Sequence, residues 1–151
     1  MKVLDKLCNV YVAIFRGTPI VVQLLVAYYV ILPLLSIKGV SSLLVGIIVF
    51  GLNSGAYVAE IMRGGINSVD KGQLEAGRAL GLPYNQTMIK IVLPQAIKNM
   101  IPSIVNQFII TLKDTSILSV IGFPELVNTA KNVVANTFMS FQTWAIVAVM
   151  Y

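Results

Sequence analysis

Two long runs without charged side chains restrict what this chain can fold into. Residues 17–37 contain no charged residue, and residues 40–59 form a second uncharged run directly after Lys38 and Gly39. An α-helix needs about 20 consecutive apolar residues to cross the hydrocarbon core of a bilayer. Hydrophobic residues make up 57% of the chain and charged residues 11%, whereas soluble domains are about one quarter charged. The sequence therefore predicts an all-α, polytopic membrane helix bundle.

Apolar character returns twice after a polar middle stretch. We expect a single membrane domain over residues 1–151, with its spans at about 17–37, 40–62, 97–122 (interrupted near 113–116) and 141–151. The last range is too short to cross a bilayer as a helix that rises about 1.5 Å per residue. We therefore expect the natural polypeptide to continue beyond Tyr151, the alternatives being a truncated gene product or a deliberately shortened chain.

The distribution of Lys and Arg predicts the orientation in the membrane. Residues 1–16 and the loop at residues 63–96 are both rich in basic side chains, while the turn between the first two spans carries only Lys38. Loops rich in Lys and Arg stay on the cytoplasmic side. Two spans separate the basic segments, so they fall on the same side, and we predict that both are cytoplasmic.

The composition excludes several kinds of catalytic site. The chain has no His and one Cys, so the residues for a Ser-His-Asp triad, a zinc site or a disulfide framework are missing. It has no Gly-rich phosphate loop ending in Gly-Lys-Ser or Gly-Lys-Thr, so we expect no nucleotide site. The net charge of +5 comes from basic residues beside the apolar runs, which is typical of membrane orientation rather than nucleic-acid binding. We predict neither an enzyme nor a chain that holds a metal or cofactor.

The polar middle stretch contains residues that are typical of the starts and ends of two short helices. Asp70 is suited to cap the first helix, and Gln73 three residues later completes a start resembling a capping box. Gly81 lies where the end of that helix requires a residue that tolerates a positive φ. Pro83 is well placed to open the second helix, and Pro94 is expected to kink or restart it.

A known spacing runs through these two helices. The pattern E-A-A, three residues, G, nine residues, I-x-L-P is matched at Glu75, Ala76, Gly81, Ile91, Leu93 and Pro94. It resembles the EAA loop of the permease subunits of bacterial ABC importers. Gly77 stands where that family usually has the second Ala, a change that keeps the position small but weakens an exposed helix by about 1 kcal/mol. The alternative is an ordinary amphipathic pair of surface helices.

Three further segments extend the resemblance over nearly the whole chain. Residues 11–19 with Gln23, residues 52–65 and residues 112–122 look like segments of permeases for polar amino acids of the histidine, glutamine and arginine group. The resemblance implies a type I ABC importer permease fold with five spans, of which this chain lacks the first and most of the last. It also implies a bacterial inner or plasma membrane location. The implied partners are a second permease subunit (identical or related), cytoplasmic ABC ATPase subunits that bind the ATP, an extracytoplasmic substrate-binding protein, the amino-acid substrate and the lipid bilayer.

The resemblance also implies a role for the loop. Residues 75–80 would form a coupling helix that docks in a groove of the ATPase, with Glu75 and Arg78 as polar contacts and Gly81 as the tight turn. The residues carried over for ATPase coupling are Glu75, Ala76, Gly77, Arg78, Gly81, Ile91, Leu93 and Pro94. For the two charged side chains, simple exposure to solvent is the alternative.

Ionisable residues inside predicted spans are candidates for the substrate path. Asp114 could bind the amino or cationic group of an amino acid, with Thr115 and Ser116 donating hydrogen bonds. The second candidate is the face shared by Asn53, Tyr57 and Glu60, which are spaced as neighbours on one side of a helix. Alternatively, Lys113 and Asp114 pair with other helices, and Glu60 pairs with Arg63 at the cytoplasmic helix end.

These patterns predict the membrane-spanning permease subunit of an ATP-driven amino-acid importer, which forms the translocation path and couples to a separate ATPase. Two alternatives stay open. A truncated, non-transporting permease remnant would fit the abrupt end at Tyr151. A fragment of a secondary amino-acid transporter would predict inverted internal repeats and no coupling loop.

Overall fold

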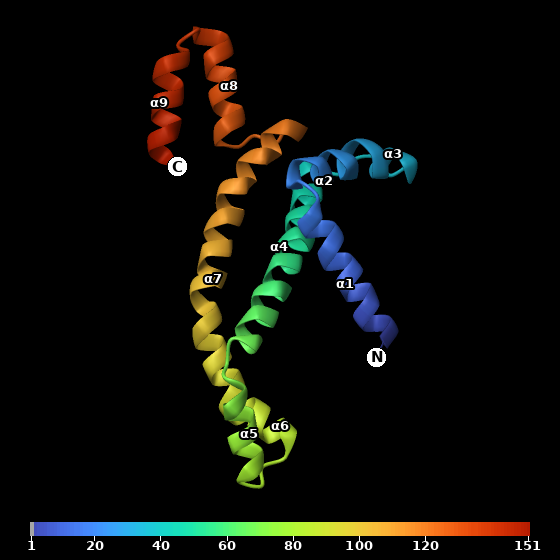
Figure 1. Cartoon of the computed structure of the whole chain (residues 1–151). Coiled ribbons are helices and arrows are strands. Elements are labelled where there is room, and N and C mark those ends of the chain that lie inside the picture. The colour runs from blue at the N-terminus through green and yellow to red at the C-terminus, as the bar shows by residue number, and fades with distance from the viewer. Residues whose placement is uncertain (1) are drawn as a thin grey trace. The chain divides into compact units, whose positions relative to one another are not determined.

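The computed structural model describes residues 2–151, and all regular elements in that range are helical (Figure 1). In chain order they are α1 (Lys2–Gly17), α2 (Ile20–Val26), the π-helical turn η1 (Ala27–Ile31), α3 (Leu32–Leu34), α4 (Ser42–Asn67), α5 (Lys71–Ala79), α6 (Tyr84–Thr87), the π-helical turn η2 (Met88–Val92), α7 (Leu93–Asp114), the 3₁₀ helix η3 (Thr115–Ile121), α8 (Leu126–Thr137) and α9 (Ser140–Met150). The expected all-α class is confirmed.

Two helical stretches of the described chain are long and apolar enough to cross a membrane. One is Ser42–Asn67, and the other runs without a break through Tyr84–Ile121. A third is counted if the pair Val3–Gly17 and Ile20–Leu34, bent by 104° between its members, forms one span. The helices continue into the expected loop, since α4 ends only at Asn67 and α7 begins at Leu93. Which part of each helix lies in the bilayer stays a prediction.

Contacts divide the chain into two units. Of the described residues, the first unit comprises residues 2–13 and Ser54–Ile109, and the second comprises Ile14–Asn53 and Ile110–Tyr151. The core of the first unit is the buried set Val69, Val92, Ala96 and Met100, against which Ile61, Ile66, Leu74 and Met88 pack. The core of the second unit is the buried set Leu24, Val45, Val49, Phe50, Leu118 and Ile121. Each unit therefore has an apolar centre of its own.

Glycine allows two close helix contacts, one in each unit. A Cβ atom added to Gly65 would lie 2.9 Å from Cβ of Met100, so α4 and α7 meet closely in the first unit. A Cβ atom on Gly46 would lie 2.6 Å from a methyl group of Leu118, so η3 packs directly on α4 in the second unit. Small residues at such crossings let helix backbones approach each other in membranes.

Both π-helical turns end two residues before a proline. The turn η1 ends at Ile31, ahead of Pro33, and η2 ends at Val92, ahead of Pro94. Proline removes one backbone donor, and its ring collides with the carbonyl four residues earlier in a regular α-helix. In both places the π turn contains that carbonyl, at Tyr29 and at Lys90. Pro94 does not break the helix, which continues from Tyr84 to Ile121, and Pro102 lies inside α7 without a π turn before it.

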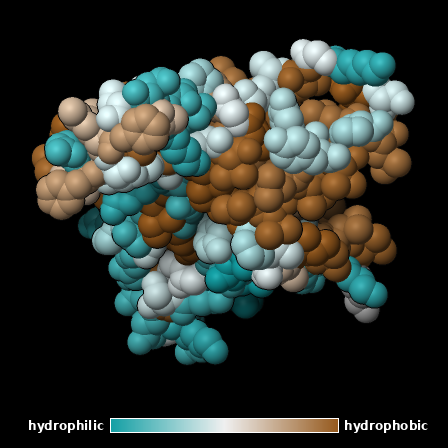
Figure 2. Space-filling model, turned by 90° about the horizontal axis from the view of Figure 1, so that it is seen from above, coloured by the Kyte–Doolittle hydropathy of each residue, from teal (hydrophilic) through white to brown (hydrophobic). Residues whose placement is uncertain are grey.

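Many large hydrophobic side chains are exposed, and Figure 2 shows a wide hydrophobic area on the face that it draws. Large hydrophobic side chains such as Leu34, Phe108 and Val149 are each at least 69% exposed. Monomeric soluble proteins rarely expose large contiguous apolar patches. A chain of this kind is covered by lipid or by other membrane helices, in agreement with its candidate spans.

Candidate functional site

The first helix of the polar loop, α5, has well-formed caps at both ends. The Asp70 carboxylate accepts a hydrogen bond from the Gly72 N–H at 2.6 Å, which confirms Asp70 as the N-cap. At the other end Gly81 has a φ of +83°, as the sequence predicts. The Gly81 N–H donates to the Arg78 carbonyl at 3.0 Å and the Leu82 N–H to the Gly77 carbonyl at 3.2 Å. This pair of bonds is the Schellman motif, which satisfies carbonyls that the helix end leaves open.

The second helix of the loop begins where the sequence predicts. Pro83 is the N-cap of α6, with a φ of −65°, and its carbonyl accepts bonds from the N–H and the hydroxyl group of Thr87. The side chain of Thr87 is fully buried. The loop thus folds as a helix, a tight turn and a second helix that leads through η2 into α7.

The departure from the EAA pattern falls at the loop glycine whose surroundings leave least room for a side chain. Gly77 is buried, and a Cβ atom added there would overlap Cγ2 of Thr87 and lie 3.0 Å from Cδ1 of Ile91. Glycine therefore lets α5 lie directly against α6 and η2. Of the eight predicted coupling residues, the structure brings Gly77 and Ile91 together at this contact.

Other predicted coupling residues lie on the outside of the loop. Glu75, Ala76, Arg78 and Gly81 are exposed, and the neighbouring Leu80 is 82% exposed. Leu93 is half-buried and Pro94 is exposed at the start of α7. The exposed face of α5 therefore presents three charged side chains, those of Lys71, Glu75 and Arg78, and the large apolar side chain of Leu80 lies next to the turn at Gly81.

Sequence reasoning missed three residues that organise this loop. These are Thr87, which packs on Gly77, and Gln95 and Asn99 of α7, which hydrogen-bond to Gln73 and Ser68. Gln73 does not complete the predicted capping box, since its side-chain oxygen accepts a bond from Gln95. The available signal was the spacing of Gln95 and Asn99, which are four residues apart and share one helix face.

Asn53 of the predicted substrate path holds helices together. Its side chain is buried, and its Nδ2 group donates to the Phe15 carbonyl at 3.2 Å and to Oε1 of Gln23 at 3.1 Å. The Nε2 group of Gln23 donates in turn to Phe15 and to Thr18. Both donor hydrogens of the Asn53 amide are therefore engaged within the chain, which favours a structural role for this residue.

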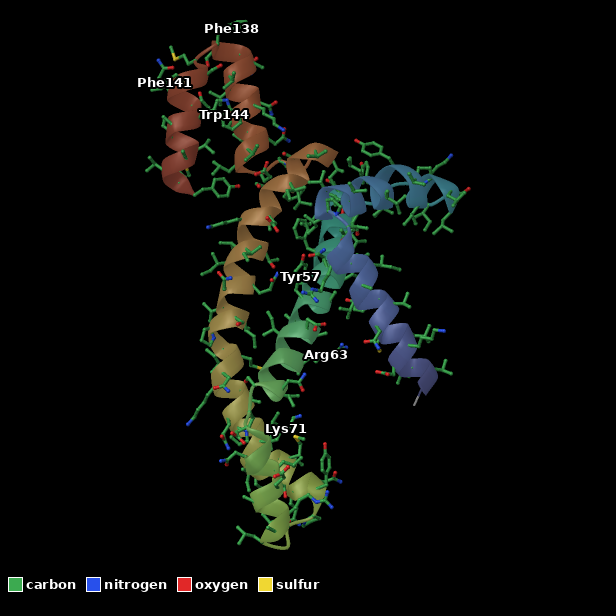
Figure 3. All side chains as sticks on the ribbon, in the orientation of Figure 1. Tyr57, Arg63, Lys71, Phe138, Phe141 and Trp144 are labelled. Carbon is green, nitrogen blue, oxygen red and sulfur yellow. The ribbon has the colours of Figure 1, made fainter. Side chains whose placement is uncertain are left out.

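Tyr57 and Glu60, the other two members of that face, are half-buried residues of α4. Figure 3 labels Tyr57 on this helix. One turn further on, Nη2 of Arg63 donates to Oδ1 of Asn9 at 2.9 Å, which joins α4 to α1 within the first unit. The i, i+3 pairing of Glu60 with Arg63 stays a prediction.

The second predicted group lies where α7 ends. Asp114 is its last residue and is half-buried, and its carboxylate does not cap η3, which follows. Thr115 is exposed and donates its hydroxyl hydrogen to the Leu112 carbonyl at 2.6 Å, while Ser116 is half-buried. The change from α to 3₁₀ geometry falls inside the range 113–116, where the sequence predicts an interrupted span.

A cavity of about 420 Å³ lies in the second unit between the end of α1, α2, η1 and α4. Its walls are apolar side chains such as Phe15, Ile31 and Val49, and Gln23 is the one polar side chain among the lining residues. The Gln23 amide is already bonded to Thr18, Phe15 and Asn53. The cavity contains none of the six predicted substrate-path residues, and its walls suit an apolar occupant rather than a polar one.

Comparison with known proteins places the chain among transport components. The family of binding-protein-dependent transport system inner membrane components matches residues 1–151. The chain is 45% identical over 149 residues to a putative glutamine transport system permease protein of Rickettsia typhi, a match that covers 99% of this chain and 68% of that relative. It is 39% identical over 142 residues to the glutamine transport system permease protein of Escherichia coli K12, with 94% of this chain and 65% of the relative covered.

A solved structure described as an amino acid ABC transporter with histidines superposes on the whole chain. The TM-score is 0.94 at 39% sequence identity, and the match covers 70% of the solved chain. The chain therefore spans about two thirds of the length of the relatives it matches. These relatives are named as transport proteins and not as enzymes. The chain belongs to the family of binding-protein-dependent transport system inner membrane components, the permease subunits of ABC transporters.

Proposed function

We propose that this chain is the membrane-spanning permease subunit of an ATP-driven importer for polar amino acids. The observation that carries the proposal is the loop between the two candidate spans, where α5 ends in a Schellman turn at Gly81 and exposes Glu75, Arg78 and Leu80. A short, capped helix with an exposed mixed face is suited to dock on a soluble protein. Relatives named for glutamine transport support an amino acid with a polar side chain as the substrate.

The loop couples the chain to the protein that consumes ATP. In this proposal α5 docks on a cytoplasmic ABC ATPase, which binds and hydrolyses the nucleotide, and the permease chain itself binds no cofactor. A second permease subunit completes the translocation path, and an extracytoplasmic binding protein delivers the substrate. The basic loop and residues 1–16 face the cytoplasm of a bacterial cell, with the spans in its inner or plasma membrane.

Affinity purification from native membranes in mild detergent, followed by mass spectrometry, tests this function. We expect an ABC ATPase to copurify with the chain, together with a permease subunit of the same family. A purification in which no ATPase is present would contradict the proposal and would favour a non-transporting membrane protein. A copurifying ion-driven transport partner without an ATPase would favour a secondary transporter.

For the substrate path, the half-buried Asp114 at the end of α7 is the stronger candidate, because the amide of Asn53 is engaged within the chain. Asp114 would bind the ammonium group of the amino acid, with Ser116 and Thr115 beside it. Replacing Asp114 with Asn should lower glutamine uptake by about tenfold or more, because a hydrogen bond to a charged group contributes about 1.5–3 kcal/mol.

Uptake of labelled glutamine into proteoliposomes that contain the assembled complex measures this effect. Asp5→Asn, on the exposed face of α1, removes an equal charge outside the proposed path and should leave uptake unchanged. Asp114→Asn should still assemble with the ATPase. Parental uptake by that variant would remove Asp114 from the substrate path.

A further inference from the structure

Two amide side chains on one face of α7 reach both sides of the turn that precedes α5. Nε2 of Gln95 donates to Oε1 of Gln73, in the first turn of α5, at 3.3 Å. Nδ2 of Asn99 donates to the Ser68 hydroxyl, just beyond the end of α4, at 2.9 Å. Gln73 and Ser68 flank the N-cap Asp70, so α7 holds the chain on each side of the cap.

One side chain of each bond also donates a hydrogen bond to a backbone carbonyl. Nε2 of Gln95 also donates to the Ile91 carbonyl in η2 at 2.9 Å, and the Ser68 hydroxyl donates to the Gly65 carbonyl at 2.8 Å. Gly65 is the point of closest approach between α4 and Met100 of α7. The result is a continuous path of hydrogen bonds from α5 through Gln95 to the π turn, and from α4 through Ser68 and Asn99 to α7.

An apolar layer lies beneath these bonds. Val69, Val92, Ala96 and Met100 are buried there, and Leu74 of α5 packs against them. Apolar contacts are not directional, so this layer alone would let α5 slide or roll on α7. Amide hydrogen bonds require a defined angle as well as a distance. Gln95 therefore adds a directional restraint on where α5 lies along α7, and Asn99 adds one on the turn at Ser68 that precedes α5.

We propose that Gln95 is a positioning residue that transmits a displacement of α5 into α7, while Asn99 holds the preceding turn at Ser68. This inference rests on the proposed function, because it assigns the residues through which movement of an ATPase-bound α5 would reach a candidate span. Gln95 contacts the π turn, and such turns are often found at functional positions in helices. A displacement of α5 would be passed from Gln73 to Gln95 and from there to η2 and α7, instead of being absorbed by movement within the apolar layer.

The contact itself is tested on the purified chain. Gln95→Met and Gln73→Met keep the length of each side chain and remove its hydrogen bonds. Thermal unfolding of both single variants and of the double variant forms a double-mutant cycle. We expect the double variant to lose less stability than the sum of the two single losses. Additive losses would show that Gln73 and Gln95 do not interact, and would overturn the inference.

The transmission is tested on the assembled complex in proteoliposomes, with glutamine as the transported probe. Gln95→Met should still copurify with the ATPase, while the glutamine taken up per ATP hydrolysed falls by about threefold or more. A purely structural role would lower assembly and leave this ratio unchanged. Gln142→Met, on the exposed face of α9, is the matched control and should retain the parental ratio.

The two failures can be told apart. A parental ratio in Gln95→Met would overturn the transmission role while the ATPase is still bound, and the proposed function would stand. Absence of the ATPase from the parental preparation would instead contradict the proposed function, and transmission to an ATPase would fall with it.

Discussion

Replacing Gly81 with Asp should reduce the amount of ATPase that copurifies with the chain by about tenfold or more. Gly81 has a φ of +83°, a conformation that costs an L-residue roughly 1–2 kcal/mol. A loss of about 1.4 kcal/mol in the free energy of binding corresponds to a tenfold loss of affinity. A Cβ atom there would meet no atom of the chain within 4 Å, so the new side chain would enter the space in which we expect the ATPase to dock. Quantitative mass spectrometry of the purified complex measures the loss.

Gly39 offers a matched control for this experiment. It has a φ of +76°, and a Cβ atom added there likewise meets nothing within 4 Å, so Gly39→Asp adds the same charge and a similar backbone strain elsewhere. We expect Gly39→Asp to retain the ATPase. An equal loss in both variants would indicate general misfolding, and an unchanged amount of ATPase with Gly81→Asp would show that docking does not depend on this turn.

Replacing Gly77 with Ala should destabilise the loop, although it restores the residue usual in the EAA pattern. Adding a methyl group to a well-packed contact costs about 1–3 kcal/mol. The better helix propensity of Ala returns up to about 1 kcal/mol of that cost. The new methyl group would overlap Cγ2 of Thr87, which is fully buried and hydrogen-bonded to Pro83, and so cannot easily move aside. We expect a lower midpoint of thermal unfolding and weaker association with the ATPase.

A second substitution tests whether the overlap with Thr87 causes this loss of stability. Thr87→Ser removes the overlapping methyl group and keeps the hydroxyl group that donates to Pro83. The double variant Gly77→Ala, Thr87→Ser should therefore regain part of the lost stability, because the added Cβ atom would still lie 3.0 Å from Cδ1 of Ile91 and 3.1 Å from Oγ1 of residue 87. Gly64→Ala is the control, because a Cβ atom there meets nothing within 4 Å and the change should be neutral or stabilising. Failure of Thr87→Ser to rescue Gly77→Ala would mean that the overlap is not the cause.

The contact at Gly77 and the link at Gln95 hold α5 in different directions. Gly77 sets how closely α5 approaches α6 and η2, and Gln95 sets where α5 lies along α7. Both converge on η2 at Ile91, which offers a side-chain contact in the first case and a carbonyl acceptor in the second. The π turn ahead of Pro94 is thus the point at which α5 is attached to the start of the candidate span.

Local sequence was sufficient to predict the helical class, the caps of α5 and the turn at Gly81. These features depend on interactions within a few residues: a carboxylate two residues from the N–H that it accepts, a glycine where φ must be positive, and a run of apolar side chains. The spacing of Glu75, Gly81 and Pro94 also indicated the protein family, which the match over residues 1–151 confirms. The roles of the coupling and substrate-path residues stay predictions.

Contacts between residues far apart in the chain were decided only by the tertiary structure. Asn53 was a candidate for substrate binding by its position on a helix face, but folding brings Phe15 and Gln23 to its amide group. Gln73 was expected to cap its own helix, but Gln95, 22 residues away, supplies a donor to its side-chain oxygen. A polar side chain bonds to whichever partner the packing of apolar faces brings within reach, and that packing is not encoded in the spacing of any one helix. The sequence determined the helical class and the caps of α5, whereas only the folded chain determined how far α4 and α7 extend and which polar groups remain available to a ligand.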